Sequence, residues 1–118
     1  MNLSRWIVAS LVVAVLAMSL TNVATAAKKP KPMDLYKEYC KPCHLPDSPN
    51  GEYTPMTLIG DQWVRFFDKK WIETHSEVLD PNHDNQPIID VISEDDLEAI
   101  KKFAIDHAAD SEQPMTCG

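Results

Sequence analysis

Cys40, Cys43 and His44 form a C-x-x-C-H sequence, in which two thiols lie three positions apart and an imidazole follows directly. On one turn of helix both thiols can reach the two vinyl groups on one side of a porphyrin and form thioether bonds. The imidazole then points at the iron as a proximal ligand. This spacing is the one used for covalent attachment of c-type haem. The motif predicts one haem c, bound through Cys40 and Cys43, with His44 on the iron.

Two other interpretations of the same residues compete with haem attachment. One is a chance C-x-x-C beside a histidine, and the other is a thioredoxin-like dithiol that exchanges disulfides. A dithiol of that kind follows a strand and opens a helix in a βαβ unit, whereas here the motif closes a short helix with no strand pattern before it. The third cysteine, Cys117, makes the number odd, so the cysteines cannot close into a disulfide framework. The sequence context therefore favours haem attachment over a chance motif or a dithiol.

Residues 1–26 have the pattern of a secretory signal peptide. A single positive charge at Arg5 precedes the uncharged apolar run of residues 6–20, and residues 24–26 read Ala-Thr-Ala, a small-residue cleavage site. The apolar run of about 15 residues is shorter than the roughly 20 needed to span a bilayer. We expect cleavage before Ala27, a periplasmic or extracellular product, and no stable membrane insertion after cleavage. Export agrees with haem attachment, which occurs outside the cytoplasm.

The processed chain is short and acidic. Cleavage would leave 92 of the 118 residues, enough for one domain, with ten basic and 18 acidic side chains and a net charge of −8. The phosphates of nucleic acids and anionic membranes repel such a chain, so we expect no nucleic-acid partner. Basic protein surfaces are the natural docking partners. We divide the processed chain into a basic, proline-rich leader (27–33), a domain (34–109) and a tail (110–118).

The domain is expected to be mainly α-helical. Residues that favour turns fill positions 45–55 and 79–90, which we expect to be irregular, and no strand pattern is longer than residues 87–89. Apolar residues recur at steps of three and four in three other segments, which predicts three helices. These segments are residues 33–44, 61–77 and 93–109, with Asp34, Asp61 and Ser93 as their N-caps.

The order of these features resembles the small mono-haem cytochromes c of the class I type. The resemblance covers residues 34–109 and rests on four features: the helix that leads into the haem motif, the segment 54–60 (Thr-Pro-Met-Thr-Leu-Ile-Gly) in the place of a Pro-x-x-Leu-x-Gly motif, an aromatic middle helix, and the closing helix that begins at Ser93. It implies a small fold of about three helices wrapped around one covalently bound haem. Leu45 departs from the pattern, because a glycine commonly follows the histidine.

The resemblance also assigns expected contacts. The first and last helices of the family cross beside the haem, so Tyr36 or Tyr39 should pack against Ile100, Phe103 or Ala104. The carbonyl of Pro55 should accept a hydrogen bond from the proximal His44, which would orient the ring. Four aromatic residues of the middle helix should shield the porphyrin, namely Trp63, Phe66, Phe67 and Trp71.

The second axial ligand of the iron is the main departure from the family pattern. The family places a methionine between the middle and last helices, and residues 79–91 contain none. We rank His75 first, because it shares the predicted apolar face of the middle helix, and His83 second, because it lies in the loop where the methionine would be. A vacant position and a methionine ligand stay open as alternatives. Either histidine would give a lower potential than a methionine. Less suited are His107, predicted to be structural, and three methionines: Met33, Met56 and Met115.

These features together predict an electron carrier and not an enzyme. The alternative is a haem protein with an open distal position that binds a diatomic gas or reduces peroxide, with weak peroxidase activity. A thiol oxidoreductase is the third hypothesis and predicts a colourless protein. Cys117 is a leftover thiol that could form a dimer or a crosslink to a partner.

Overall fold

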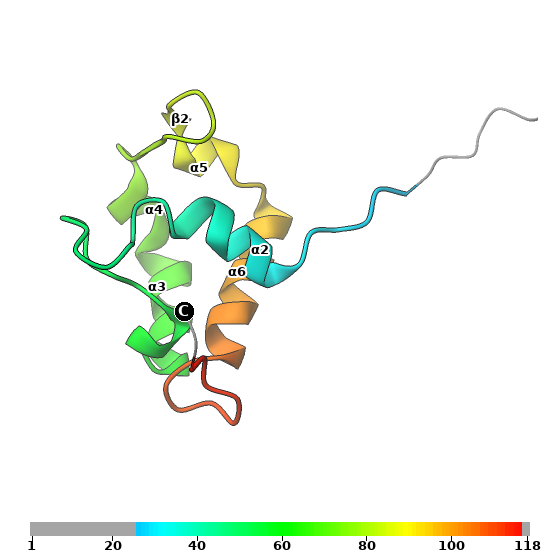
Figure 1. Ribbon diagram of the computed structural model, residues 1–118, viewed down its shortest axis with the longest axis vertical. Helices are drawn as coiled ribbons and strands as arrows, with labels where there is room; N and C mark the ends of the chain where they lie inside the picture. Colours follow the sequence, from blue (N-terminus) through cyan, green and yellow to red (C-terminus); the bar gives the residue numbers. More distant parts are fainter. Residues whose placement is uncertain (1–25, 117–118) are drawn as a thin grey trace, which may run out of the picture.

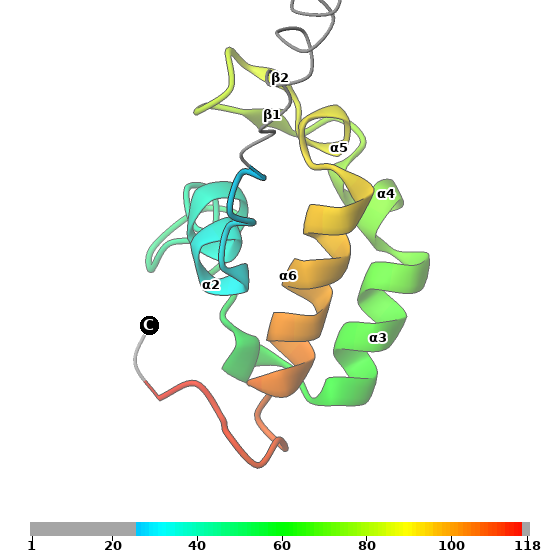
Figure 2. The ribbon, with the colours of Figure 1, turned by 90° about the vertical axis from the view of Figure 1, so that its right-hand side faces the viewer.

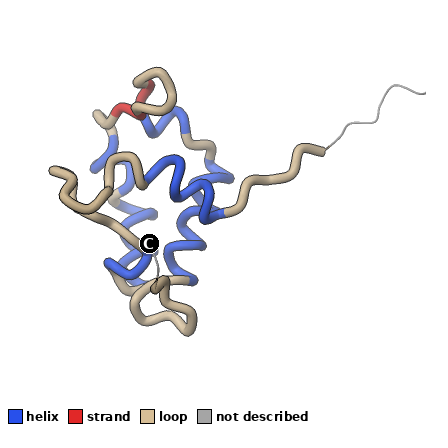
Figure 3. The backbone as a smooth tube through the Cα atoms, in the orientation of Figure 1, coloured by secondary structure: helices blue, strands red, loops and turns tan. Residues whose placement is uncertain are grey.

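The computed structural model describes residues 26–116, and this part of the chain is mainly α-helical, as predicted (Figures 1 and 3). None of its helices is long and apolar enough to cross a membrane. The predicted signal peptide, up to residue 25, and Cys117 lie outside the described residues. The elements in chain order are α2 (Pro32–Leu35), the π-helical turn η2 (Tyr36–Cys40), the 3-10 turn η3 (Pro55–Thr57), α3 (Gly60–Lys69), α4 (Trp71–His75), β1 (Leu79–Asp80), β2 (Gln86–Pro87), α5 (Ile88–Val91) and α6 (Glu94–Asp106).

The first helix begins earlier than predicted and changes its winding before the cysteines. Pro32 occupies its first turn and Lys31 is the N-cap, so the prediction of Asp34 as N-cap is wrong; proline at this position has its φ fixed near the helical value and its missing N–H is not needed. From Tyr36 to Cys40 the winding is π-helical, with the Lys41 amide bonded to the Tyr36 carbonyl at 3.2 Å. Single π-turns are frequent at functional sites.

The middle helix is interrupted, although the sequence predicts one continuous helix over residues 61–77. The backbone of Lys70 stays in the right-handed helical region but is distorted, with φ −117°, and this residue separates α3 from α4. No proline or glycine marks this break, so local sequence does not signal it. The predicted N-cap is also wrong, because α3 begins at Gly60 and Asp61 lies inside its first turn. A residue from the tail, Asp110, accepts the Gly60 amide at 2.8 Å.

The last helix and its cap are confirmed. The Ser93 hydroxyl accepts the Asp96 amide at 3.1 Å, and three acidic residues in the first turn favour the positive end of the helix. The helix ends at Asp106, three residues before the predicted end. Figure 2 shows α6 between α2 on one side and α3 on the other, and both contact it. Tyr36 packs against Phe103 with ring centroids 5.7 Å apart, which is one of the contacts expected of the first and last helices.

The loop between α4 and α6 is more ordered than predicted. Its two-residue strands β1 and β2 pair antiparallel, and α5 follows at once. The expectation of an irregular segment over residues 79–90 is therefore wrong in part, because tertiary pairing orders a sequence rich in turn residues. Asp84 and Asn85 make the tight turn with φ of 55° and 53°, and both residue types tolerate this left-handed geometry.

Candidate functional site

The C-x-x-C-H motif lies on the wall of a cavity of about 440 Å³, within the range of about 300–1,000 Å³ typical of ligand and cofactor pockets. Cys40 ends the π-turn η2, and the chain then turns so that the His44 amide bonds the Cys40 carbonyl at 3.1 Å. Cys40, Cys43 and His44 all line the cavity, together with Tyr36 and Tyr39. The π-turn and the turn that follows it thus place the whole motif along one cavity.

The opposite wall of the cavity is aromatic and belongs to α3 and α4. Trp63, Phe66, Phe67 and Trp71, the residues expected to shield a porphyrin, all line it. They contact one another in sequence, with ring centroids 5.3 Å apart for Phe66 and Phe67 and 6.2 Å for Phe67 and Trp71. Side chains of α6 complete the apolar lining. Phe66 meets Phe67 and Trp71 edge to face, whereas Phe67 and Trp71 are stacked at 30°, so the lining offers both ring faces and ring edges to a ligand.

Within residues 26–116, the imidazole of His44 has a hydrogen-bond partner at one nitrogen. Its Nδ1 lies 2.9 Å from the Gly51 carbonyl oxygen, and the edge of Tyr53 contacts the ring at a centroid distance of 5.0 Å. The tautomer that donates from Nδ1 to this carbonyl presents a bare Nε2, the form in which histidine binds metals. The arrangement suits a ligand role for His44.

Pro55 does not make the contact that the resemblance implies. Its carbonyl accepts a 2.9 Å hydrogen bond from Trp63 Nε1, and Gly51 supplies the partner of His44 instead. Pro55 begins a 3-10 turn that aims its carbonyl at the indole, while the left-handed Gly51 (φ 78°) brings its own carbonyl to the histidine. Pro55 lines the cavity and positions the aromatic wall. Leu45 stands where a glycine is common in the family. The left-handed residue of this loop is instead Asp47, two positions later, with a φ of 63°.

His75 lines the same cavity as His44 and is likewise anchored through Nδ1. Its Nδ1 is 3.1 Å from the Trp71 carbonyl oxygen and 2.8 Å from Thr74 Oγ1, which leaves Nε2 for a ligand. The ring stacks on the indole of Trp71 with centroids 4.1 Å apart. Burial lowers the pKa of His75 against a smaller opposing effect of the Trp71 carbonyl, and His44 lowers it a little further. The neutral imidazole, the metal-binding form, is therefore favoured.

The two imidazoles are spaced for a shared ion. Their centroids are 6.3 Å apart and their planes meet at 69°. A metal held by one nitrogen of each ring at about 2.0–2.1 Å, the usual distance for a divalent ion, keeps the centroids about 6 Å apart. The distance between the rings therefore allows His44 and His75 to be the residues that would hold one metal ion in this cavity.

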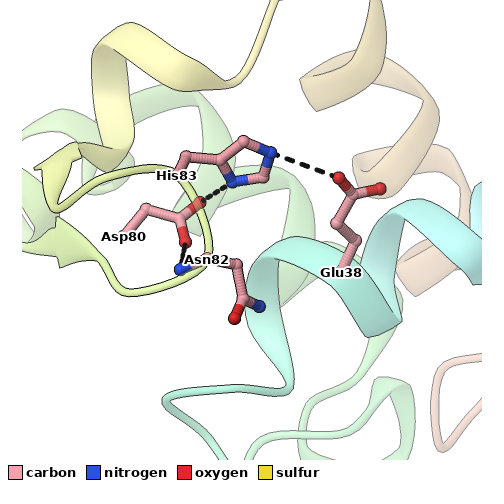
Figure 4. A network of polar contacts seen from close by, with 4 residues as sticks. All are labelled: Glu38, Asp80, Asn82 and His83. Atoms are coloured by element: carbon pink, nitrogen blue, oxygen red, sulfur yellow. Dashed lines mark hydrogen bonds and ion pairs between the residues drawn. The ribbon is translucent and has the colours of Figure 1, made fainter.

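His83, the alternative ligand, has both ring nitrogens engaged by carboxylates (Figure 4). Nδ1 is 2.8 Å from Asp80 Oδ2, and Nε2 is 3.3 Å from Glu38 Oε1. The ring stacks on Tyr39 at 5.4 Å and is not among the residues that line the cavity. The structure thus brings His75 to His44 and ties His83 to two carboxylates.

The remaining donors lie away from the site. His107 is half-buried at the end of α6, with Nδ1 2.8 Å from the Gln113 carbonyl oxygen, as expected of a structural histidine. Met33 and Met56 are exposed, and Met115 bonds its amide to the His107 carbonyl. None of these four residues lines the cavity.

The thiol of Cys40 has a raised pKa, whereas a redox nucleophile has a lowered one. Burial, and after it the neighbouring Cys43, raises the pKa of Cys40 to about 12. Thioredoxin-like dithiols act through a thiolate whose pKa is lowered. The environment of Cys40 therefore disfavours disulfide exchange as the use of this motif.

Three residues that shape the site are missing from the sequence-based prediction. Gly51 and Thr74 each meet a histidine Nδ1, and Asp80 is a carboxylate only 2% exposed that also lines the cavity. Thr74 directly precedes His75 on the predicted middle helix, so a contact between their side chains could have been predicted. No periodic pattern points to Gly51 or Asp80, since both lie in turn-rich segments.

Comparison with family models, curated proteins and solved structures found no match to this chain.

Proposed function

We propose that this chain is an exported electron carrier of the cytochrome c type, with one haem bound through Cys40 and Cys43 and its iron held by His44 and His75. The observation that carries the proposal is that two imidazoles with centroids 6.3 Å apart line one cavity together with both cysteines. The haem supplies a single-electron couple when bound.

The protein's own part in this function is to hold the two imidazoles in place and to shield the site from water. Gly51 and Trp71 orient the two imidazoles through their Nδ1 atoms, so the ligand set need not reorganise when the charge at the metal changes. The aromatic wall of α3 and α4 excludes water from the site. Two nitrogen ligands favour a lower potential than a nitrogen and a thioether. If His44 and His75 both hold the iron, no ligand position would stay open for a gas or peroxide, so that alternative is disfavoured.

Electrons would pass to and from other proteins at the surface. The excess of acidic over basic side chains favours donors or acceptors with basic docking surfaces and speeds encounter at low salt. Export by residues 1–26 would place these partners in the periplasm or outside the cell.

The proposal is tested with protein produced in cells competent in cytochrome maturation. Intact mass should equal that of the processed chain plus one haem, and the spectrum should be six-coordinate and low-spin in both oxidation states. His75→Ala should lose the low-spin ferric spectrum and bind carbon monoxide without displacing a ligand, whereas the matched His83→Ala should do neither. The bare apoprotein mass would refute haem attachment. A low-spin spectrum in His75→Ala would refute the ligand assignment alone.

A further inference from the structure

His83 lies between two carboxylates at the edge of the cavity (Figure 4). Asp80 Oδ2 is 2.8 Å from its Nδ1, and Glu38 Oε1 is 3.3 Å from its Nε2. A neutral imidazole donates from one nitrogen only, whereas the cation donates from both. Only the protonated ring satisfies the two carboxylates together. The site is therefore built to bind a proton on His83.

Asp80 connects this proton site to the cavity. Its side chain is 2% exposed and lines the cavity, and its other oxygen accepts the Asn82 amide at 2.8 Å. A buried carboxylate needs a compensating positive charge. Among the described residues, the ion-pair partner of Asp80 is His83, with no lysine or arginine within 4.0 Å. The imidazole is 31% exposed, so it exchanges protons with water.

We propose that the Asp80–His83 pair takes up a proton when the protein accepts an electron and releases it on oxidation. This inference rests on the proposed function. The electron comes from the reduced partner protein, and the proton comes from water and binds the imidazole of His83. Reduction adds a negative charge to a cavity whose wall already holds the Asp80 carboxylate. The cationic form of His83 offsets that charge, so reduction raises its proton affinity.

The other titratable groups near His83 are carboxylates and a phenol. Glu38 comes from η2, Asp84 from the same loop, and Asp96 of α6 acts on the neighbouring Tyr39. Of the side-chain types in this cluster, histidine is the one whose charge ordinarily changes between pH 5 and 8. Burial, and then Glu38, raises the pKa of Tyr39 above its usual 10, so the phenol stays neutral. His83 is the group in this cluster that changes charge.

The experiment is potentiometry of the haem-loaded protein between pH 5 and 8.5. We expect the midpoint potential of the wild type to fall as pH rises, with a slope no steeper than about 59 mV per pH unit, the value for one proton per electron. His83→Gln keeps a polar side chain but cannot take up a proton, so its potential should be flat over this range. The matched control, His107→Gln at the far end of α6, should keep the wild-type slope.

A second variant and a second readout make the test independent of His83→Gln. Glu38→Gln keeps the Asp80–His83 pair but removes one carboxylate, so the sloping region should move to lower pH. In NMR titrations of the wild type, the imidazole of His83 should titrate at higher pH in the reduced protein than in the oxidised one. A flat wild-type potential, a slope that persists in His83→Gln, or identical titrations in both redox states would overturn the inference while leaving haem binding intact. An intact mass without haem would instead refute the proposed function, and this inference with it.

Discussion

The imidazole of His75 stacks on the indole of Trp71 with ring centroids 4.1 Å apart and planes inclined by 29°. Trp71 also supplies the carbonyl that meets His75 Nδ1, so one residue fixes both the plane and the rotation of the ring. The indole is 6% exposed and belongs to the main apolar cluster with Leu35, Ile88 and Ile100. The orientation of the proposed distal ligand is therefore tied to the core of the fold.

Replacing Trp71 should damage stability and ligation together. We expect Trp71→Ala to lower the free energy of unfolding by about 3–5 kcal/mol, as for other buried aromatic truncations, and to raise the high-spin fraction of the ferric spectrum. Trp71→Phe keeps a flat ring against His75 and should retain a low-spin spectrum. Urea unfolding and absorption spectra of the loaded proteins measure both effects. A fully low-spin Trp71→Ala protein would show that stacking does not position the ligand.

Thr74 should tune the potential through the same imidazole. Its hydroxyl lies 2.8 Å from His75 Nδ1 and 2.8 Å from the Lys70 carbonyl oxygen, so it can accept from the ring while it donates to the backbone. Accepting this hydrogen bond makes the imidazole a stronger donor to the oxidised metal, which lowers the potential.

Thr74→Val should therefore raise the midpoint potential. A hydrogen bond worth about 0.5–1.5 kcal/mol bounds the change at roughly 60 mV, while Thr74→Ser should stay near the wild type. Both variants keep the Trp71 carbonyl as a partner of Nδ1, so the low-spin spectrum should survive in each. Equal potentials in the valine and serine variants would contradict a role for the hydroxyl.

Sequence alone predicted the helical class, the cap at Ser93 and the residues of the aromatic wall, because each depends on local spacing. It also ranked His75 above His83 from helix periodicity; the His75 and His44 ring centroids are 6.3 Å apart in the structure, and the ligand role of His75 stays a prediction. The break at Lys70 was not predicted, since no local breaker residue marks it. The identity of the carbonyl that orients His44 was not predicted either, because it depends on how the loop of residues 45–55 folds back.

The cap of α3 illustrates the same limit. Asp61 has the residue type and position expected of an N-cap, but the carboxylate that meets the first amide comes from Asp110, 50 residues later. Only the packing of the tail beneath α3 and α6 brings the two together. The Ala109 amide bonds the Leu58 carbonyl in the same region, so residues beyond the last helix help to hold the middle helix.

Loss of the Asp110 carboxylate should therefore destabilise a helix that is distant in sequence. We expect Asp110→Ala to lower the free energy of unfolding by about 0.5–2 kcal/mol, the range for loss of a helix N-cap, with a smaller loss in Asp110→Asn. Glu112→Ala, two residues further into the same tail, is the matched control and should be near neutral. Equal stabilities of the Asp110→Ala and Glu112→Ala proteins would argue against the cap.

The haem-free precursor offers a direct test of the environment of Cys40. Because burial and Cys43 raise its pKa from the usual 9.0 to about 12, the Cys40 thiolate, which is the reactive form, is scarce at pH 8 and becomes abundant only far above it. Iodoacetamide should therefore modify Cys43 before Cys40, and the rate at Cys40 should still be rising at pH 10. Peptide mapping by mass spectrometry after timed quenching separates the two sites, and unfolding in urea should equalise their rates. Faster modification of Cys40 at neutral pH would mean that its thiol is activated, and it would restore disulfide exchange as a use of the motif.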